Sequence, residues 1–207
     1  MNDLIEFDLD EIDYLQELLN VAFGDATSVI SNMLDTFATL HIPKIKLLNI
    51  GEVQNFINKN FDHIDDYFVF SQQFRGDMEG EAIFISNQDS IKHLSLVLND
   101  DEEDLEEIED MIDLASEMLN IVNSATIKRM AKELSQDVFF RQPSVKSVKS
   151  KEIVSDTNIS QYKTVIVVST ILDFEKEDIK GTLYVLLKPK SIEIIKTAVE
   201  DFFDEEC

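Results

Sequence analysis

Two groups of side chains in this sequence could do chemistry, and both combine carboxylates with a carboxamide at helical spacing. Each group has an Asp, a Glu four residues later, an Asn three residues after that, and a Pro 23 residues further along. The members are Asp13, Glu17, Asn20 and Pro43 in the first group and Asp113, Glu117, Asn120 and Pro143 in the second. A carboxylate can pair with a cation, and a carboxamide can both donate and accept hydrogen bonds. Such a pair can bind a charged partner and orient a water molecule.

The spacing places the Asp, Glu and Asn of each group on one side of a helix. An α-helix advances about 100° per residue, so positions four and seven residues apart share a face. The apolar residues of the two segments point mainly the other way, and they are Leu15, Leu18, Leu19 and Ala22 in the first segment and Leu114, Met118, Ile121 and Val122 in the second. We therefore expect each helix to bury its apolar face and to expose a Glu and an Asn one turn apart.

An exposed Asp, Glu or Asn on an amphipathic helix is ordinarily a solvated side chain, and for either group alone that interpretation would be preferred. The repetition argues against it. Asn is a poor helix former because its side chain competes for backbone hydrogen bonds, yet the sequence places one at the same point twice. Neighbouring positions differ between the copies, as with Phe23 against Asn123 and Gly24 against Ser124.

The elements that must position these groups follow from periodicity and from turn residues. Helical spacing predicts a long amphipathic helix from Asp10, its expected N-cap, to about Thr39, and a second one carrying Asp113 that ends near Leu134. The acidic run 100–110 would stabilise the start of the second helix through its dipole. The remaining predictions are strands at 44–50, 66–74, 80–86, 144–149, 163–174 and 181–187 and helices at 90–98 and 191–203.

The second half of the sequence repeats the order of the first. Gly80 corresponds to Gly181, and Ser90-Ile91 corresponds to Ser191-Ile192. These matches predict an internal duplication. We expect a single α+β domain over 1–207, made of two repeats at about 8–100 and 106–207. A pseudo-twofold axis would relate them, in a largely antiparallel β-sheet packed with two long motif-bearing helices and shorter helices.

Composition excludes several classes of function. With 42 acidic and 18 basic residues the formal charge is −24, which repels nucleic acid and anionic lipid surfaces. The apolar runs are too short to span a membrane, and the N-terminal residues lack the pattern of a signal peptide, so we expect a cytoplasmic protein. The one cysteine, Cys207, and the three histidines show no metal-ligand spacing, so no metal site is expected.

The repeated pattern resembles the signature of the CheC, CheX and FliY family of phosphatases in bacterial chemotaxis. That signature has Asp or Ser, three residues, Glu, two residues, Asn, 22 residues and Pro, and both copies here satisfy it. Two copies in a chain of this length are typical of the CheC type within the family. The sequence departs from the family in the Gly-rich stretch that often follows the Asn. The first copy keeps only Gly24, and the second has none.

The resemblance implies a function and a role for each residue. The substrate would be the phospho-aspartate of a CheY-like response regulator, whose receiver domain supplies its own Mg²⁺ and lysine, so the phosphatase needs no cofactor of its own. Asn20 and Asn120 would position the attacking water, and Glu17 and Glu117 would pair with the receiver's lysine. Asp13 and Asp113 would have a supporting role, while Pro43 and Pro143 would set the turn from helix into strand.

Three alternatives remain open at the level of sequence. The middle domain of the flagellar switch protein FliM is similar to this family and binds phosphorylated CheY without hydrolysing it. Proteins of the CheC type also bind the deamidase CheD, and the sequence does not locate a surface for that partner. The third alternative is an unrelated acidic adaptor in which both motifs are accidental, and it requires two coincidences of identical spacing.

Overall fold

The structure is a computed structural model that describes residues 7–34, 39–40, 44–59, 66–98, 108–149, 164–174 and 179–205. The helices are α1 (Leu9–Leu34), α2 (Ile50–Asn58), α3 (Gln88–Leu98), α4 (Ile108–Glu133) and α5 (Pro189–Glu205). The strands are β1 (Thr39–Leu40), β2 (Lys44–Asn49), β3 (Asp66–Gly76), β4 (Gly80–Asn87), β5 (Val138–Phe140), β6 (Ser144–Lys149), β7 (Thr164–Phe174) and β8 (Ile179–Leu187). The predicted α+β class with a largely antiparallel sheet is confirmed.

Most predicted elements are present, and the differences are local. The prediction of Asp10 as N-cap is wrong. The Oδ1 of Asp8 accepts a hydrogen bond from the Glu11 backbone N–H at 2.9 Å, and the Asp8 N–H donates to the Glu11 carboxylate at 2.7 Å, so these two residues form the capping box. Helix α4 begins with Glu109 and Asp110 in its first turn. Of the run 100–110, the structure describes only residues 108–110.

Sequence reasoning missed helix α2 and the short strands β1 and β5. The sequence did contain a signal for α2, because Asn49 and Glu52 have the spacing of a capping box and Val53 and Ile57 follow at helical spacing. In the structure the Asn49 backbone N–H donates to the side chain of Glu52 at 3.1 Å, and Val53 and Ile57 are buried. Strands of two and three residues, such as β1 and β5, give no usable periodicity and form only because a longer strand lies beside them.

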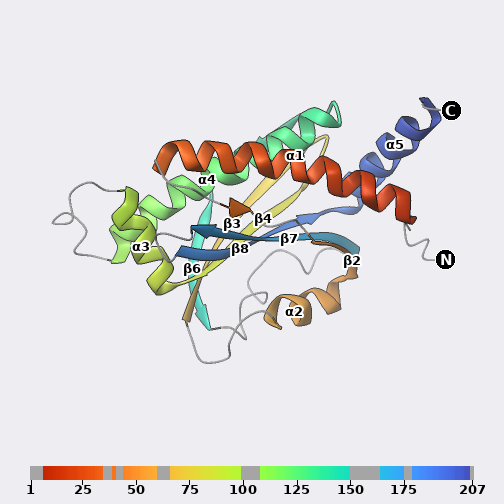
Figure 1. Cartoon of the computed structure of the whole chain (residues 1–207). Coiled ribbons are helices and arrows are strands. Elements are labelled where there is room, and N and C mark those ends of the chain that lie inside the picture. Colours follow the sequence, from red (N-terminus) through yellow and green to blue (C-terminus); the bar gives the residue numbers. More distant parts are fainter. Residues whose placement is uncertain are drawn as a thin grey trace.

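One sheet organises the molecule, and its two faces are covered differently. The strand order is β1-β7-β8-β4-β3-β5, with β2 also paired to β7 and β6 also paired to β3. All these pairings are antiparallel. Helices α1, α3, α4 and α5 pack on one face, and α2 packs on the other (Figure 1). No helix within the described ranges combines the length and apolar character needed to cross a lipid bilayer.

The two halves of the chain exchange strands across this sheet. Strand β2 of the first half pairs with β7 of the second, while β6 of the second half pairs with β3 of the first. At the centre β4 pairs with β8, and Ile83 lies opposite Tyr184. Neither half therefore has a complete sheet of its own. This arrangement agrees with an approximate twofold axis between β4 and β8, while the internal duplication itself stays a prediction.

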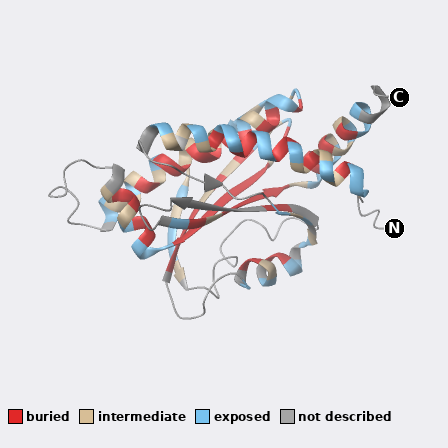
Figure 2. Ribbon diagram, in the orientation of Figure 1, coloured by how far each residue is buried: buried red, intermediate tan, exposed pale blue. Residues whose placement is uncertain are grey.

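The larger part of the core lies between the sheet and the long helices. Leu15, Leu19 and Phe23 from α1 and Met118 and Val122 from α4 are buried against the sheet. Figure 2 shows buried positions mainly on the side of both helices that faces the sheet, with exposed positions mainly on the outer side. The predicted division of each long helix into a buried and an exposed face is confirmed for these residues.

Two glycines at matching places in the central strands allow aromatic rings to lie directly on the backbone. A Cβ atom at Gly181 would overlap the ring of Phe84, and one at Gly80 would overlap the ring of Phe74 and the carbonyl oxygen of Leu186. Both rings are buried. These glycines are therefore needed for close packing at the centre of the sheet, where no other residue type fits without movement of a buried ring.

We expect Gly181→Ala to lower the free energy of unfolding by about 1–3 kcal/mol, because the added methyl group must displace the buried ring of Phe84. Chemical denaturation measures this change. Gly24→Ala is a matched control, since Gly24 is exposed in the middle of α1 and a Cβ there meets no atom within 4 Å. It should instead raise stability by roughly 0.5–1 kcal/mol, because Ala is the better helix former. Equal effects of the two substitutions would contradict this account.

A buried carboxyl group lies on the face of the sheet that α2 covers. Glu81 is 3% exposed, and its position in β4 alternates with Ala82 and Phe84, which face the long helices. Burial raises the pKa of Glu81 above its ordinary value of 4.5, against opposing effects of Ser71 and Lys188. Among the described residues its Oε2 atom has no hydrogen-bond partner. An ionised carboxylate here destabilises the fold, because it is removed from water without full compensation.

We expect Glu81→Gln to raise the melting temperature at neutral pH and to have little effect near pH ~4. The folded state binds the Glu81 proton more tightly than the unfolded state does. The wild type therefore loses stability as the pH rises above 4.5, the ordinary pKa at which the unfolded chain ionises. Thermal melts of both proteins across this pH range measure the difference. A benefit of the Gln variant that grew as the pH fell would contradict the assigned burial.

Candidate functional site

Three contacts fix the N-terminal half of α1, which carries the first motif. The carboxylate of Glu11 accepts a hydrogen bond from the Lys196 ammonium group of α5 at 2.8 Å. This contact raises the pKa of Lys196, chiefly through the hydrogen bond. The ring of Tyr14 packs on Phe202 of α5 with 4.5 Å between the centroids. Together with the Asp8 cap, these contacts set the rotation of α1 relative to α5.

Helix α4, which carries the second motif, is held by α3 and by α1. The Ser95 hydroxyl of α3 lies 2.9 Å from the carbonyl oxygens of Ile91 and Met111, so it joins α3 to the first turns of α4. Arg129 forms an ion pair with Asp25 of α1 at 3.2 Å. This pair is partly exposed and contributes modestly to stability, so the buried apolar faces provide most of the attachment.

The two long helices run side by side in opposite directions (Figure 1). Arg129 of α4 forms an ion pair with Asp25 of α1. One turn later in α4, Glu133 lines a groove together with Val21, which lies one turn earlier in α1. Moving forward along α4 therefore means moving backward along α1. Both motifs lie in the N-terminal halves of their helices. The antiparallel packing therefore places them at opposite ends of the helix pair, and the structure does not bring the two copies into one site.

The first motif lies on the outer surface of α1. Asp13, Glu17 and Asn20 are exposed, and Leu18 and Leu19 between them are buried. None of the other described residues hydrogen-bonds to the Asn20 side chain. Pro43 lies outside the described residues. The structure thus has the Glu and the Asn of this copy on one solvent-facing surface, as the spacing indicated.

The second motif differs from the first in its carboxamide. Asp113 and Glu117 are exposed, but Asn120 is only half-exposed. Its Oδ1 accepts a hydrogen bond from the Nε2 of Gln72, a buried residue of β3. The expectation of two equally exposed Glu and Asn faces therefore does not hold for Asn120. Its helix lies close enough to β3 for a strand residue to reach it.

Pro143 is half-buried and directly precedes β6. Its fixed φ suits the entry of the chain into this strand. Helix α4 already ends at Glu133, and β5 follows it. Pro143 therefore lies between two strands, β5 and β6, and not at the turn from helix into strand that was predicted.

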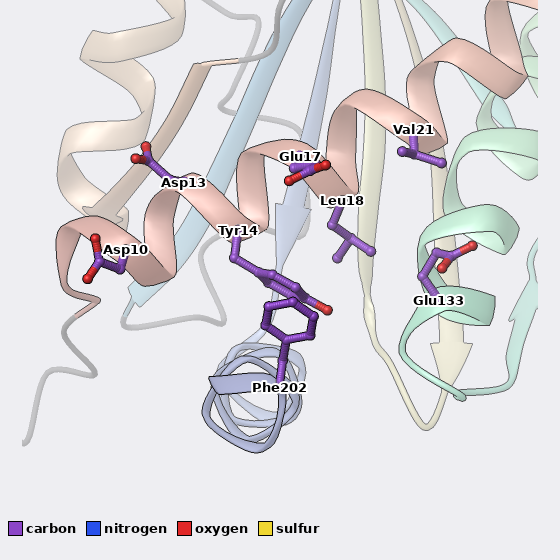
Figure 3. A pocket seen from close by; sticks show the side chains of 8 residues that line it. All are labelled: Asp10, Asp13, Tyr14, Glu17, Leu18, Val21, Glu133 and Phe202. Atoms are coloured by element: carbon purple, nitrogen blue, oxygen red, sulfur yellow. The ribbon is translucent and has the colours of Figure 1, made fainter. Parts of the chain in front are cut away.

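A groove of about 480 Å³ opens beside the first motif. Its apolar floor comes from Tyr14, Leu18 and Val21 of α1 and Phe202 of α5, and its rim carries the carboxylates of Asp10, Asp13, Glu17 and Glu133. In the close view of Figure 3 the rings of Tyr14 and Phe202 lie against each other, and Glu133 approaches from α4. Val21 and Phe202 are exposed although they are apolar. This surface is suited to a partner with both apolar and cationic side chains.

Sequence reasoning missed Gln72 and this groove. Gln72 lies within a predicted strand, but nothing in the sequence connects it with a helix 48 residues away. The groove depends on the angle at which α5 crosses α1. A weak signal existed in Val21, an apolar residue on the otherwise polar side of the first helix.

The chemistry available at both motifs is limited to binding and positioning. Each offers a carboxylate and a neutral carboxamide, and neither segment 13–20 nor segment 113–120 contains a Cys or a His. Ser116 precedes Glu117, but its hydroxyl donates to the carbonyl oxygen of Ile112 at 2.7 Å and is thus engaged with the helix backbone. Within the described part of the chain no group of three or more His, Cys, Asp or Glu side chains could hold a metal ion. Such a surface can pair with a cation on a partner and can orient a water molecule.

Comparison with known proteins gives a result only at the level of structure. No family model matches the sequence, and no curated protein matches it. The structure of FliY from Thermotoga maritima is similar with a TM-score of 0.74 and 14% identity, over 95% of this chain and 99% of that one. The FliM middle domain from H. pylori gives a TM-score of 0.58 at 12% identity, over 93% and 99% of the two chains.

A third similar structure is a CheX-CheY complex from Borrelia burgdorferi that contains BeF₃ and Mg²⁺. Its TM-score is 0.53 at 12% identity, over 82% of this chain and 97% of that one. FliY, CheX and the FliM middle domain thus share this arrangement of sheet and helices at low sequence identity. The chain has the fold of the CheC, CheX and FliY proteins of bacterial chemotaxis.

Proposed function

We propose that this chain is a CheC-type phosphatase that hydrolyses the phospho-aspartate of a CheY-like response regulator. One observation carries the proposal. Glu17 and Asn20 lie one turn apart on an exposed helix surface at the spacing of the CheC, CheX and FliY signature, and Glu117 and Asn120 occupy the matching place on α4. The similarity to CheX in its complex with CheY supports a receiver domain as the partner.

In this mechanism a water molecule attacks the phosphorus in line with the bond to the aspartate oxygen. The new oxygen–phosphorus bond forms as the old one breaks, and the products are inorganic phosphate and a free aspartate. Catalysis of such a transfer depends mainly on the position of the nucleophile and on stabilised charge. Asn20 would accept a hydrogen bond from the water and fix its direction. A carboxamide suits this role because it adds no negative charge near the phosphoryl group.

Glu17 would bind the receiver rather than take part in bond formation. Its carboxylate, one turn before Asn20, would pair with the lysine of the receiver's active site through a charge-assisted hydrogen bond. Asp13 would support this contact. The receiver would bring the Mg²⁺ that neutralises the phosphoryl oxygens, so this chain would need no metal of its own. Glu117 and Asp113 would act in the same way on α4.

The groove beside Glu17 would add docking surface. Its exposed floor residues Val21 and Phe202 lie within reach of a partner bound at the motif, and its carboxylate rim would attract basic side chains of that partner. A chain of net charge −24 repels an acidic receiver at long range, so short-range contacts of this kind must provide the affinity.

A second function is binding without hydrolysis. The FliM middle domain has this fold. The resemblance described above implies that it binds phosphorylated CheY without hydrolysing it, and this chain would then do the same. The presence of both Glu and Asn pairs favours catalysis over this alternative. Binding of CheD would be a further role, but none of the surfaces described above points to that partner.

We expect Asn20→Ala and Asn120→Ala each to reduce phosphate release from a phosphorylated CheY-like protein, and the double variant to lose about 100-fold or more, because the attacking water is no longer positioned. Release of phosphate over time measures the rate. Asn55→Ala is the matched control, since Asn55 is an exposed helical asparagine on α2, across the sheet from both motifs. It should have wild-type activity.

Two outcomes of this experiment would argue against the proposal. An undiminished rate in the double variant would exclude the assigned role of the carboxamides. Tight binding of the phosphorylated receiver by the wild type, without phosphate release, would favour the non-catalytic alternative.

We expect Val21→Glu to raise KM several-fold with little change in kcat, because it replaces apolar docking surface by a like charge one turn from the catalytic face. Leu9→Glu is the control: Leu9 is 80% exposed on the same helix but does not line the groove. Steady-state kinetics of both variants separate docking from chemistry. An equal rise in KM for both would show that net charge, and not the groove, sets the affinity.

A further inference from the structure

The carboxamides of the two motifs have different surroundings. Asn20 is exposed, whereas Asn120 is held by Gln72, which is only 2% exposed. The Nε2 atom of Gln72 donates one hydrogen bond to the Oδ1 of Asn120 and lies 3.2 Å from the carbonyl oxygen of Arg141. Both N–H groups of the Gln72 amide are therefore engaged.

The backbone of Arg141 fixes the orientation of both amides. A carbonyl oxygen can only accept, so it must face the NH₂ group of Gln72 and not its oxygen. The second N–H of Gln72 then needs an acceptor, which Asn120 can provide only with Oδ1. A reversed Asn120 would place two NH₂ groups against each other. Because Gln72 is buried, water does not replace the lost partner, and the reversed orientation is disfavoured by roughly tenfold or more.

This orientation directs the oxygen of Asn120 toward β3 and its NH₂ group away from Gln72. A water molecule on the outer side of α4 therefore meets a donor. A water that accepts a hydrogen bond gives up electron density from the oxygen that must attack phosphorus, whereas a water that donates to a carboxamide oxygen keeps a lone pair free for attack. Asn20 can rotate to present its oxygen, and Asn120 as held by Gln72 cannot do so without losing a buried hydrogen bond.

We infer that Gln72 is a positioning residue that makes the second motif a slow hydrolytic site, one that binds the phosphorylated receiver through the NH₂ group of Asn120. The first motif then carries most of the turnover, so Asn20→Ala should lower phosphate release more than Asn120→Ala does. This inference rests on the proposed phosphatase function for its kinetic consequence. The orientation of Asn120 follows from the Gln72 and Arg141 contacts alone.

The register of the sheet, read with the predicted duplication, supports the same difference. Ser71 pairs with Ser144, and Ser169 pairs with Lys44 at the corresponding place in the other half. Under the predicted internal duplication, Gln72 then corresponds to Thr170. Threonine has no carboxamide, so the sequence of the first motif's half has no counterpart of Gln72 at this position.

The kinetic test isolates the second motif in an Asn20→Ala background. We expect Gln72→Met in that background to raise kcat for phosphate release about fivefold or more, because Met fills the same space but leaves Asn120 free to rotate. Gln73→Met is the matched control, since Gln73 is the next residue of β3 and its side chain points to the opposite face of the sheet. An unchanged or lower kcat with Gln72→Met would overturn the inference.

A structural test separates this inference from the proposed function. Hydrogen exchange of side-chain amides, followed by ¹⁵N NMR on the full chain, should show slow exchange for Gln72, and Asn120→Ala should accelerate it. Asn20→Ala should leave it unchanged. Gln72 exchange that is insensitive to Asn120→Ala would overturn the inference even if the wild type is an active phosphatase. Slow exchange in a wild type without phosphatase activity would contradict only the proposed function.

Discussion

The burial of one face of α1 and one face of α4 against a single antiparallel sheet is the constraint on which the rest of this molecule depends. Leu19 and Met118 are almost fully buried, and the strands beneath them bring aromatic rings onto glycine backbone at Gly80 and Gly181. Since apolar burial is the largest favourable contribution to folding, the rotation of both helices is fixed by their apolar residues. The Glu and Asn side chains then face outward without any contact of their own being needed to turn them.

The exchange of strands between the two halves places both motif-bearing helices on one shared sheet. Strand β7 lies against β2, and strand β3 lies against β6, so each half completes the sheet of the other. The same exchange brings β3 beneath α4, where Gln72 reaches Asn120. A contact that spans 48 residues thus makes two motifs of identical sequence spacing chemically different.

Electrostatics limits how such a surface can work. The chain carries a formal charge of −24, and carboxylates surround the groove beside the first motif. A catalytic carboxylate at the position of Asn20 would repel a phosphoryl group, whereas a neutral amide does not. The negative rim is suited instead to cationic side chains of a partner, and the exposed rings and methyl groups between the carboxylates supply contact at short range. In the proposed function, affinity and chemistry are therefore separated on the surface of α1.

The sequence by itself determined the α+β class, the positions of the long helices and main strands, and the placement of Glu17, Asn20 and Glu117 on exposed helix faces. These features follow from local periodicity, in which each residue's side is set by its neighbours along the chain. The tertiary structure alone decided the antiparallel packing of α1 and α4, the groove closed by Phe202, and the hold of Gln72 on Asn120. Each of these depends on residues distant in sequence that meet only when the sheet has formed, and no local pattern encodes which of them will touch.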